Sequence, residues 1–132
     1  MVKFKPFEKK FLEQNEIGRL ATLSRDGFPH VVPVSYLYHH GNICVAVDYG
    51  TRKYQNMLKN KKIALVMDKV NPNQGLLILG KIKIIEKGKK FQRIYKVFNE
   101  KFAWVRANPW KDGEAPFVEV EPHRKSNWGL SG

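Results

Sequence analysis

Cysteine is almost absent from this chain, which has only Cys44 among its 132 residues. A single thiol cannot close a disulfide within the chain, and it has no partner at metal-ligand spacing, so Cys44 is predicted to be a small buried strand residue. His39 and His40 adjoin a turn, where neighbouring strand residues point to opposite faces, and they are not expected to share a metal. We therefore predict no metal site, and any redox chemistry must come from a bound cofactor.

Long apolar runs are missing as well. No stretch approaches the roughly 20 consecutive apolar residues that a bilayer-spanning helix needs. The opening residues, MVKFKPFEKK, lack the apolar centre of a signal peptide. These absences predict a cytoplasmic protein that makes no membrane contact.

Acidic residues are few: 12 Asp and Glu stand against 24 Lys and Arg, for a formal net charge of +12. Such a charge raises the local concentration of anions, including nucleotides and phosphates. The cations are scattered along the whole chain, which is more typical of a solvated surface than of a nucleic-acid groove.

What the chain does contain is enough apolar material for one core. Its residues are 42% hydrophobic and 12% aromatic, which excludes a disordered chain. The length fits one ordinary domain, so residues 1–132 are predicted to form a single cofactor-binding domain.

The first half of the chain predicts a helix followed by a β-meander. Pro6 is typical of a first helical turn, and the apolar spacing after it indicates a helix over residues 6–15. Pro33 removes a hydrogen-bond donor from the middle of its strand, which should therefore be bent or lie at an edge. Turns at Asp26-Gly27 and Gly41-Asn42 join the three expected strands, 19–24, 30–39 and 42–48.

The second half predicts two helices and three more strands. An amphipathic helix capped by Thr51 should end near Lys61, and a stripe of apolar residues indicates another helix over 89–102. Residues 103–115 show no clear period and are interpreted as a loop. The remaining strands are expected at 62–69, 76–85 and 117–121, with the last residues as a tail. Because the helices do not alternate with the strands, the pattern favours a mainly β, closed antiparallel barrel of six strands over a parallel sheet.

The most informative segment is DYGTRKYQN, residues 48–56, where a strand ends and a capped helix begins. Arg52 and Lys53 fall in the first turn of that helix, where the helix dipole already places positive charge. A phosphate bound by the free backbone N–H groups, the Thr51 hydroxyl and both cations would compensate this charge. The alternative is that both side chains extend into water.

The order of these segments resembles the pyridoxamine 5′-phosphate oxidase-like, FMN-binding split-barrel superfamily, from Arg19 to Gly129. The resemblance rests on RLATLSRDGFPHVVPVSYLY, DYGTRKYQNMLKNKKIALVM, GKIKII and the closing FVEVEPHRKSNWG. It implies a six-stranded antiparallel Greek-key split β-barrel with peripheral helices, binding FMN in a homodimer.

The resemblance also implies a set of cofactor-binding residues. Arg19 matches an arginine that reaches the flavin phosphate, and Trp128 matches a tryptophan that closes over the cofactor from the partner subunit. The family's Ser-Arg-Lys turn matches Thr51, Arg52 and Lys53. The residues expected along the flavin are Ala21, Thr22 and Leu23 of the first strand and Ala46 and Val47 before the turn.

The resemblance implies a flavin-dependent oxidoreductase that passes hydride between FMN and a small planar substrate. The chain lacks the longer tail with which the true oxidases bind pyridoxal phosphate, so vitamin B6 oxidation is not expected. No catalytic acid or base is identified, which is compatible with a flavoprotein because the flavin carries the hydride chemistry.

Two alternatives remain open. The first is a related reductase that uses deazaflavin, whose anionic tail suits the basic surface, and a further subgroup binds haem. The second is a non-catalytic barrel that binds flavin or single-stranded nucleic acid, with Tyr36 and Tyr38 as a candidate stacking pair. No Lys or Arg alternates with these tyrosines, so nucleic acid is the less favoured partner.

Overall fold

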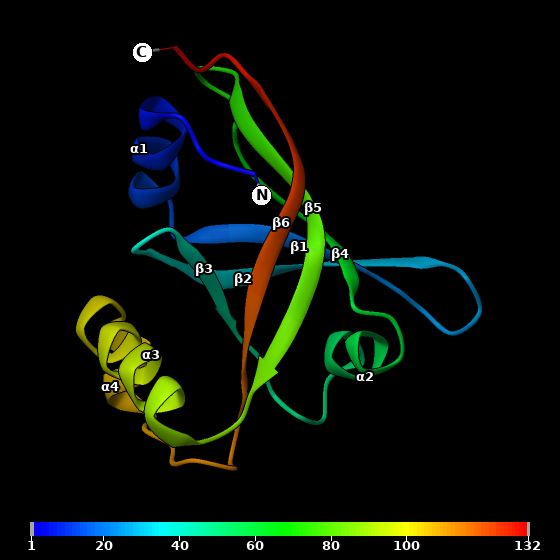
Figure 1. Ribbon diagram of the computed structural model, residues 1–132, viewed down its shortest axis with the longest axis vertical. Coiled ribbons are helices and arrows are strands. Elements are labelled where there is room, and N and C mark those ends of the chain that lie inside the picture. Colours follow the sequence, from blue (N-terminus) through cyan, green and yellow to red (C-terminus); the bar gives the residue numbers. More distant parts are fainter. Residues whose placement is uncertain (1, 132) are drawn as a thin grey trace.

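Six antiparallel strands close into a barrel in the computed structural model, which describes residues 2–131 (Figure 1). The strand order around the barrel is β1-β2-β3-β6-β5-β4, so β6 closes the meander by pairing with both β3 and β5. This confirms the predicted mainly β, antiparallel split barrel. The strands are β1 (Ile17–Leu23), β2 (Pro29–His39), β3 (Asn42–Ala46), β4 (Lys62–Lys69), β5 (Gln74–Ile85) and β6 (Phe117–Trp128).

The barrel is filled by the alternate residues of its strands. Leu20 of β1 lies opposite Leu65 of β4, which lies opposite Ile78 of β5, and all three side chains are fully buried. Successive strand residues point to opposite faces, so the intervening residues form the outer surface of the sheet. The apolar alternation in the sequence therefore sets which residues face inward.

β2 changes partners along its length, and this explains how Pro33 is tolerated. Residues 29–35 pair with β1, whereas residues 36–39 pair with β3. Pro33 lies in the first part, exposed and opposite Arg19. A proline at an edge removes no hydrogen bond that the sheet needs, as predicted for this strand.

Four helices surround the barrel in the described residues: α1 (Pro6–Gln14), α2 (Arg52–Lys59), α3 (Gly88–Lys101) and α4 (Ala103–Ala107). In Figure 1, α3 and α4 lie together on one flank of the barrel and α2 lies on the other side of the lower end. The prediction of a loop over residues 103–115 was wrong for α4. This helix has one fully buried residue, Val105, and five residues are too few to show a period. No helix within residues 2–131 has the length and apolar composition needed to cross a bilayer.

The last strand also extends further than predicted, because β6 continues through Pro122 to Trp128. The pairing of β5 with β6 shifts register between Leu79 and Gly80, where Gly80 lies opposite Pro122. A Cβ atom on Gly80 would lie 2.2 Å from the Glu121 carbonyl oxygen, so only glycine fits there. A proline at such an irregularity does not end the strand, which is why the shorter prediction was wrong.

Helix α1 is tied to the barrel by a buried carboxylate. Glu8, almost fully buried, accepts hydrogen bonds from the Lys5 backbone N–H at 2.7 Å and from Asn127 Nδ2 at 2.7 Å. It also pairs with the ammonium group of Lys125. Burial raises the pKa of Glu8, but the bonds from Lys125, Lys5 and Asn127 outweigh this effect and the net pKa is lowered. The network therefore stabilises the end of β6 only while Glu8 is ionised.

We expect Glu8→Gln to lower the free energy of unfolding by about 1–3 kcal/mol at pH 7, since it leaves a bond to a charged group unmade. A carboxyl group whose pKa is lowered by folding stabilises the protein above its unfolded pKa, and the effect is lost as the pH falls. The difference from wild type should thus shrink below about pH 4, near the unfolded pKa of Glu. Urea unfolding at both pH values measures it. Glu13→Gln, an exposed change on the same helix, is the control, and an equal loss in both variants would contradict the prediction.

Candidate functional site

The start of helix α2 has the geometry of an anion site. The Thr51 side chain caps the helix: its hydroxyl oxygen accepts from the Tyr54 backbone N–H at 3.4 Å. The same hydroxyl donates to the Asp48 carbonyl at 2.7 Å. The first turn contains no acidic residue, and no hydrogen bond in the described part of the chain uses the backbone N–H groups of Arg52 or Lys53. The helix start thus combines two free N–H groups with two cations, an arrangement that favours a bound phosphate.

A buried amide holds α2 against β1. Asn56 is almost fully buried, and its Nδ2 atom donates to the hydroxyl of Thr22 at 3.0 Å and to that of Ser24 at 3.4 Å. The Thr22 hydroxyl is therefore used within the protein. Sequence reasoning missed Asn56, although a polar residue beside the inward-facing Tyr54 and Met57 was a usable signal.

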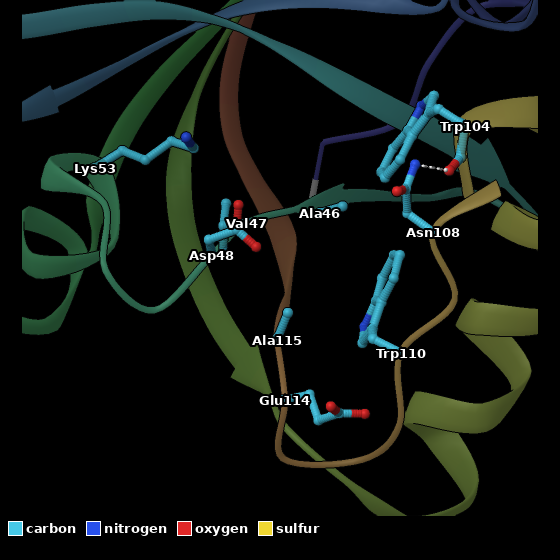
Figure 2. A pocket seen from close by; sticks show the side chains of 9 residues that line it. All are labelled: Ala46, Val47, Asp48, Lys53, Trp104, Asn108, Trp110, Glu114 and Ala115. Carbon is cyan, nitrogen blue, oxygen red and sulfur yellow. Dashed lines mark hydrogen bonds between the residues drawn. The ribbon is translucent and has the colours of Figure 1, made fainter. Parts of the chain in front are cut away.

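A pocket of about 470 Å³ opens beside this helix start (Figure 2). Three predicted cofactor residues, Ala46, Val47 and Lys53, line it together. In Figure 2, Lys53 extends from the α2 side, and the tryptophans stand on the opposite side of the pocket. The other lining residues are Asp48, Trp104, Asn108, Trp110, Glu114 and Ala115.

The far wall of the pocket is aromatic. The rings of Trp104 and Trp110 are 9° from parallel, with their centroids 6.0 Å apart. Trp110 packs edge-on against Tyr95 and donates its backbone N–H to the Tyr95 hydroxyl at 3.2 Å. Asn108 is held by a bond of 3.1 Å from its Nδ2 to the Trp104 carbonyl. Sequence reasoning missed this wall because it lies in the segment interpreted as a loop, where the only signal was the two tryptophans themselves.

The other predicted cofactor residues lie away from this pocket in the same chain. Arg19, Ala21 and Leu23 face outward from β1, where the Arg19 guanidinium pairs with Asp68 of β4. Trp128 lies at the far end of β6, opposite Gly75. The structure therefore brings together the predicted residues before and at the start of α2. The predicted residues of β1 and Trp128 lie elsewhere in the same chain, and their contact with a cofactor stays a prediction.

Trp128 lies over a glycine. A Cβ atom on Gly75 would be 2.0 Å from the Trp128 ring, so the absence of a side chain at Gly75 makes room for the indole. The Trp128 side chain remains 38% exposed. Part of this residue thus stays accessible to a ligand or a partner.

Cys44 and the histidines show no sign of a metal site. Cys44 is a buried strand residue, as predicted, and burial raises the pKa of its thiol to about 12. The rings of His39 and His40 lie 3.9 Å apart, because the turn gives His40 a φ of 49°. The expectation that they face opposite ways was wrong. Within residues 2–131, no three His, Cys, Asp or Glu side chains are placed to hold a metal ion.

Tyr36 and Tyr38 do not form an exposed stacking pair. Tyr36 is fully buried and donates its hydroxyl to the Leu12 carbonyl at 2.6 Å, and Tyr38 is partly buried. The nucleic-acid alternative therefore loses the aromatic platform on which it depended.

Comparison with known proteins agrees with the barrel. A sequence model described as pyridoxamine 5′-phosphate oxidase matches residues 4–129. The chain belongs to this family. This confirms the resemblance seen in the sequence and extends it to α1.

Part of the chain is similar in sequence to a characterised reductase. Over 72 residues the chain is 38% identical to a 5a,11a-dehydrotetracycline/5a,11a-dehydrooxytetracycline reductase of Streptomyces rimosus, a match that covers 49% of this chain and 51% of the reductase. The chain thus spans about half the length of this curated relative.

Two solved structures share the barrel over nearly the whole chain. HutZ, a haem storage protein of Vibrio cholerae, has a TM-score of 0.79 at 14% identity, covering 98% of this chain and 96% of HutZ. A structure described as an F420 reductase has a TM-score of 0.69 at 22% identity, covering 89% of this chain and 94% of the reductase. At these identities the similarity shows the fold alone.

Proposed function

We propose that this protein is an FMN-dependent oxidoreductase that passes hydride between the flavin and a small planar substrate. The observation that carries the proposal is that Ala46, Val47 and Lys53 line one pocket directly beside a capped helix start with free N–H groups. The family membership and the reductases among its relatives support the reaction class.

The residues present fit a phosphorylated flavin. The backbone N–H groups of Arg52 and Lys53 and their two cationic side chains would hold the phosphate. Thr51 contributes chiefly by capping the helix, because its hydroxyl proton is already donated to the Asp48 carbonyl. Ala46 and Val47 would lie along the ring system, where their small side chains allow close approach.

The chemistry divides between the flavin and the protein. A bound flavin would supply the capacity to accept and donate hydride. The chain itself would orient the reactants between Ala46 and the tryptophan wall and exclude water from this pocket. Thr22 would contribute through its backbone at most, since its side chain is buried, where it accepts a hydrogen bond from Asn56 Nδ2.

Titration of the cofactor-free protein with FMN and with riboflavin tests the phosphate site. We expect FMN to bind at least about tenfold more tightly, since a hydrogen bond to a charged group contributes about 1.5–3 kcal/mol. Equal affinities would contradict the proposal.

Extraction and mass measurement of the native cofactor separate FMN from its rivals. Deazaflavin is the second candidate, supported by the similarity to the F420 reductase structure and by a phosphate site that would serve either molecule. A haem spectrum, or a colourless preparation with excess ultraviolet absorption from nucleic acid, would contradict both. We propose the cytoplasm as the location, where one buried free thiol needs no oxidising environment.

We further propose that two copies pair through the outer face of β1 and its neighbours. Ile17 and Leu23 of β1 are 49% and 45% exposed, and Val31 of β2 is 58% exposed. Val31 lies opposite Ala21, which in turn lies opposite Ala64 of β4, so these three residues adjoin on the outward face of the sheet that also carries Ile17 and Leu23. Such a patch on strands marks an interaction surface, and a second copy covers it symmetrically.

Pairing would also complete the cofactor site. Arg19 and Leu23 lie on this face, while Trp128 projects from the far end of β6. A partner seated on the face would let Trp128 of one copy reach the cofactor site of the other. Within one chain Trp128 lies against Gly75, away from the pocket, and does not reach its own site. In this arrangement Arg19 would reach the phosphate only by leaving Asp68.

Val31→Glu is expected to convert the dimer to monomers, because each interface would then replace two apolar side chains by two buried carboxylates. Sedimentation velocity at several concentrations measures the change, and flavin content should fall with it. Val70→Glu, at an 87% exposed position outside the strands, is the matched control. A wild-type protein that is monomeric with full flavin occupancy would refute the pairing.

A further inference from the structure

The pocket is lined by more acidic than basic side chains, although the chain as a whole is strongly basic. Lys and Arg outnumber Asp and Glu by two to one in the sequence, whereas the pocket is lined by two carboxylates, Asp48 and Glu114, and one cation, Lys53. Under the proposed function Lys53 is used by the cofactor phosphate. The charged side chains that remain for a second ligand, Asp48 and Glu114, are both negative.

The hydrogen-bonding groups on the tryptophan side are mostly acceptors. Asn108 uses its Nδ2 to bond the Trp104 carbonyl, and its Oδ1 has no hydrogen bond from any residue within 2–131. Figure 2 shows this oxygen on the side that faces Ala46. Glu114 accepts from the Lys111 backbone N–H at 2.6 Å through Oε1, so its second oxygen is available. The Asp48 carboxylate makes no hydrogen bond or ion pair with any described residue.

The aromatic wall adds a surface for a flat ring. Trp104 and Trp110 are nearly parallel, and Trp104 is 40% exposed, so a ring can stack on it without moving the core. Indole faces attract positive charge and electron-poor rings, and tryptophan does so most strongly among the aromatic side chains. The stacking surface and the hydrogen-bond acceptors therefore both favour a flat ring that carries hydrogen-bond donors or positive charge.

We infer that this side of the pocket selects a flat ring that is neutral or cationic and carries N–H or O–H donors, and that it discriminates against carboxylated or phosphorylated rings. The inference rests on the proposed function for the role of that ring as the substrate. Asp48, Asn108 and Glu114 accept its donors or face its charge, and Trp104 and Trp110 stack against it. None of these residues is assigned a proton transfer.

Three bicyclic probes of matched size test the selection: N-methylquinolinium, 2-naphthol and 2-naphthoate. Isothermal titration of the FMN-loaded protein should show the first two binding about tenfold more tightly than 2-naphthoate, the range that cation–π and charge complementarity allow. This ranking is opposite to the one that a net charge of +12 would produce non-specifically.

Variants then assign the effect to residues. Glu114→Gln should weaken N-methylquinolinium several-fold and leave 2-naphthol nearly unchanged. Glu121→Gln removes the same charge from the exposed face of β6, where it pairs with Lys83, and should change neither. Trp104→Leu should weaken all three probes, and N-methylquinolinium most, because it removes both the stacking surface and the cation–π attraction.

Several results would overturn the inference: tightest binding of 2-naphthoate, no binding of any probe, or an equal effect of the two glutamate variants. Probe binding that FMN abolishes would also overturn it, because the wall would then hold the flavin itself. The FMN titration of the same samples tests the proposed function separately. A protein that binds FMN and prefers 2-naphthoate keeps the function and loses the inference. If the protein has no FMN affinity, the same titrations are run without cofactor, and the predicted ranking there keeps the ligand preference and loses the function.

Discussion

Phe117→Ala should lower the free energy of unfolding by about 3–5 kcal/mol, the range for removing a fully buried aromatic side chain. Phe117 is the first residue of β6 and faces outward from the barrel, yet it is 0% exposed because α3 and the tryptophan segment cover it. The centroid of its ring lies 4.9 Å from the ring centroid of Phe98, 5.0 Å from that of Phe91 and 5.8 Å from that of Trp110. It therefore links the helical flank to the barrel.

The same change should open the pocket, since Trp110 rests on the Phe117 ring. Urea unfolding measures the stability, and tryptophan emission in the folded state reports whether the wall has moved. Phe117→Leu keeps most of the volume and should cost about 1.5 kcal/mol or less, which preserves a folded sample. Phe28→Ala, at a 72% exposed turn position, is the control. A loss below about 1 kcal/mol in Phe117→Ala would show that α3 does not depend on this contact.

Arg52→Ala and Lys53→Ala should each weaken FMN binding by about 1.5–3 kcal/mol, or roughly 10- to 150-fold, the contribution of a hydrogen bond to a charged group. Riboflavin affinity should hardly change, because riboflavin lacks the phosphate that these cations contact. The barrel should remain folded, as Arg52 is exposed and Lys53 is only half-buried. Removal of either cation also relieves repulsion at the helix N-terminus, so thermal stability without flavin should stay equal or rise.

Fluorescence titration with both flavins, at two salt concentrations, measures this effect. Lys59→Ala, in the last turn of the same helix, removes an identical charge on the same element and is the matched control. If FMN and riboflavin lose affinity equally in Lys53→Ala, the side chain contacts the ring and not the phosphate. If neither flavin responds to either change, the α2 start is not the phosphate site.

The strands could be predicted because the patterns that indicate them involve residues close together in the sequence. In β4, residues alternate between the core and the surface, so the apolar pattern identifies both the strand and its inner face. Glycine turns such as Asp26-Gly27, with a φ of 88° at the glycine, mark where strands end. The α2 start was predictable for the same reason, since cap, glycine and cations are neighbours in sequence.

The tryptophan wall and the full length of β6 could not be predicted in this way. Helix α4 has five residues, fewer than two turns, and is stabilised mainly by packing Val105 into the cluster around Phe98. β6 continues past Pro122 only because Gly80, more than forty residues earlier, makes room for the irregular pairing. Both features depend on contacts between segments that are distant in the chain.

The sequence by itself determined the antiparallel barrel, the inner faces of its strands and the cluster of Thr51, Arg52 and Lys53, because each follows from periodicity or from adjacent residues. The family came from the resemblance of whole segments to known proteins, which the match over residues 4–129 confirmed. Only the tertiary structure decided that Lys53 shares a pocket with Trp104 and Trp110 and that Arg19 pairs instead with Asp68. It also decided that Glu8 joins α1 to the end of β6. These pairings depend on how strands and helices pack in three dimensions, and no local pattern encodes which distant side chains that packing brings together.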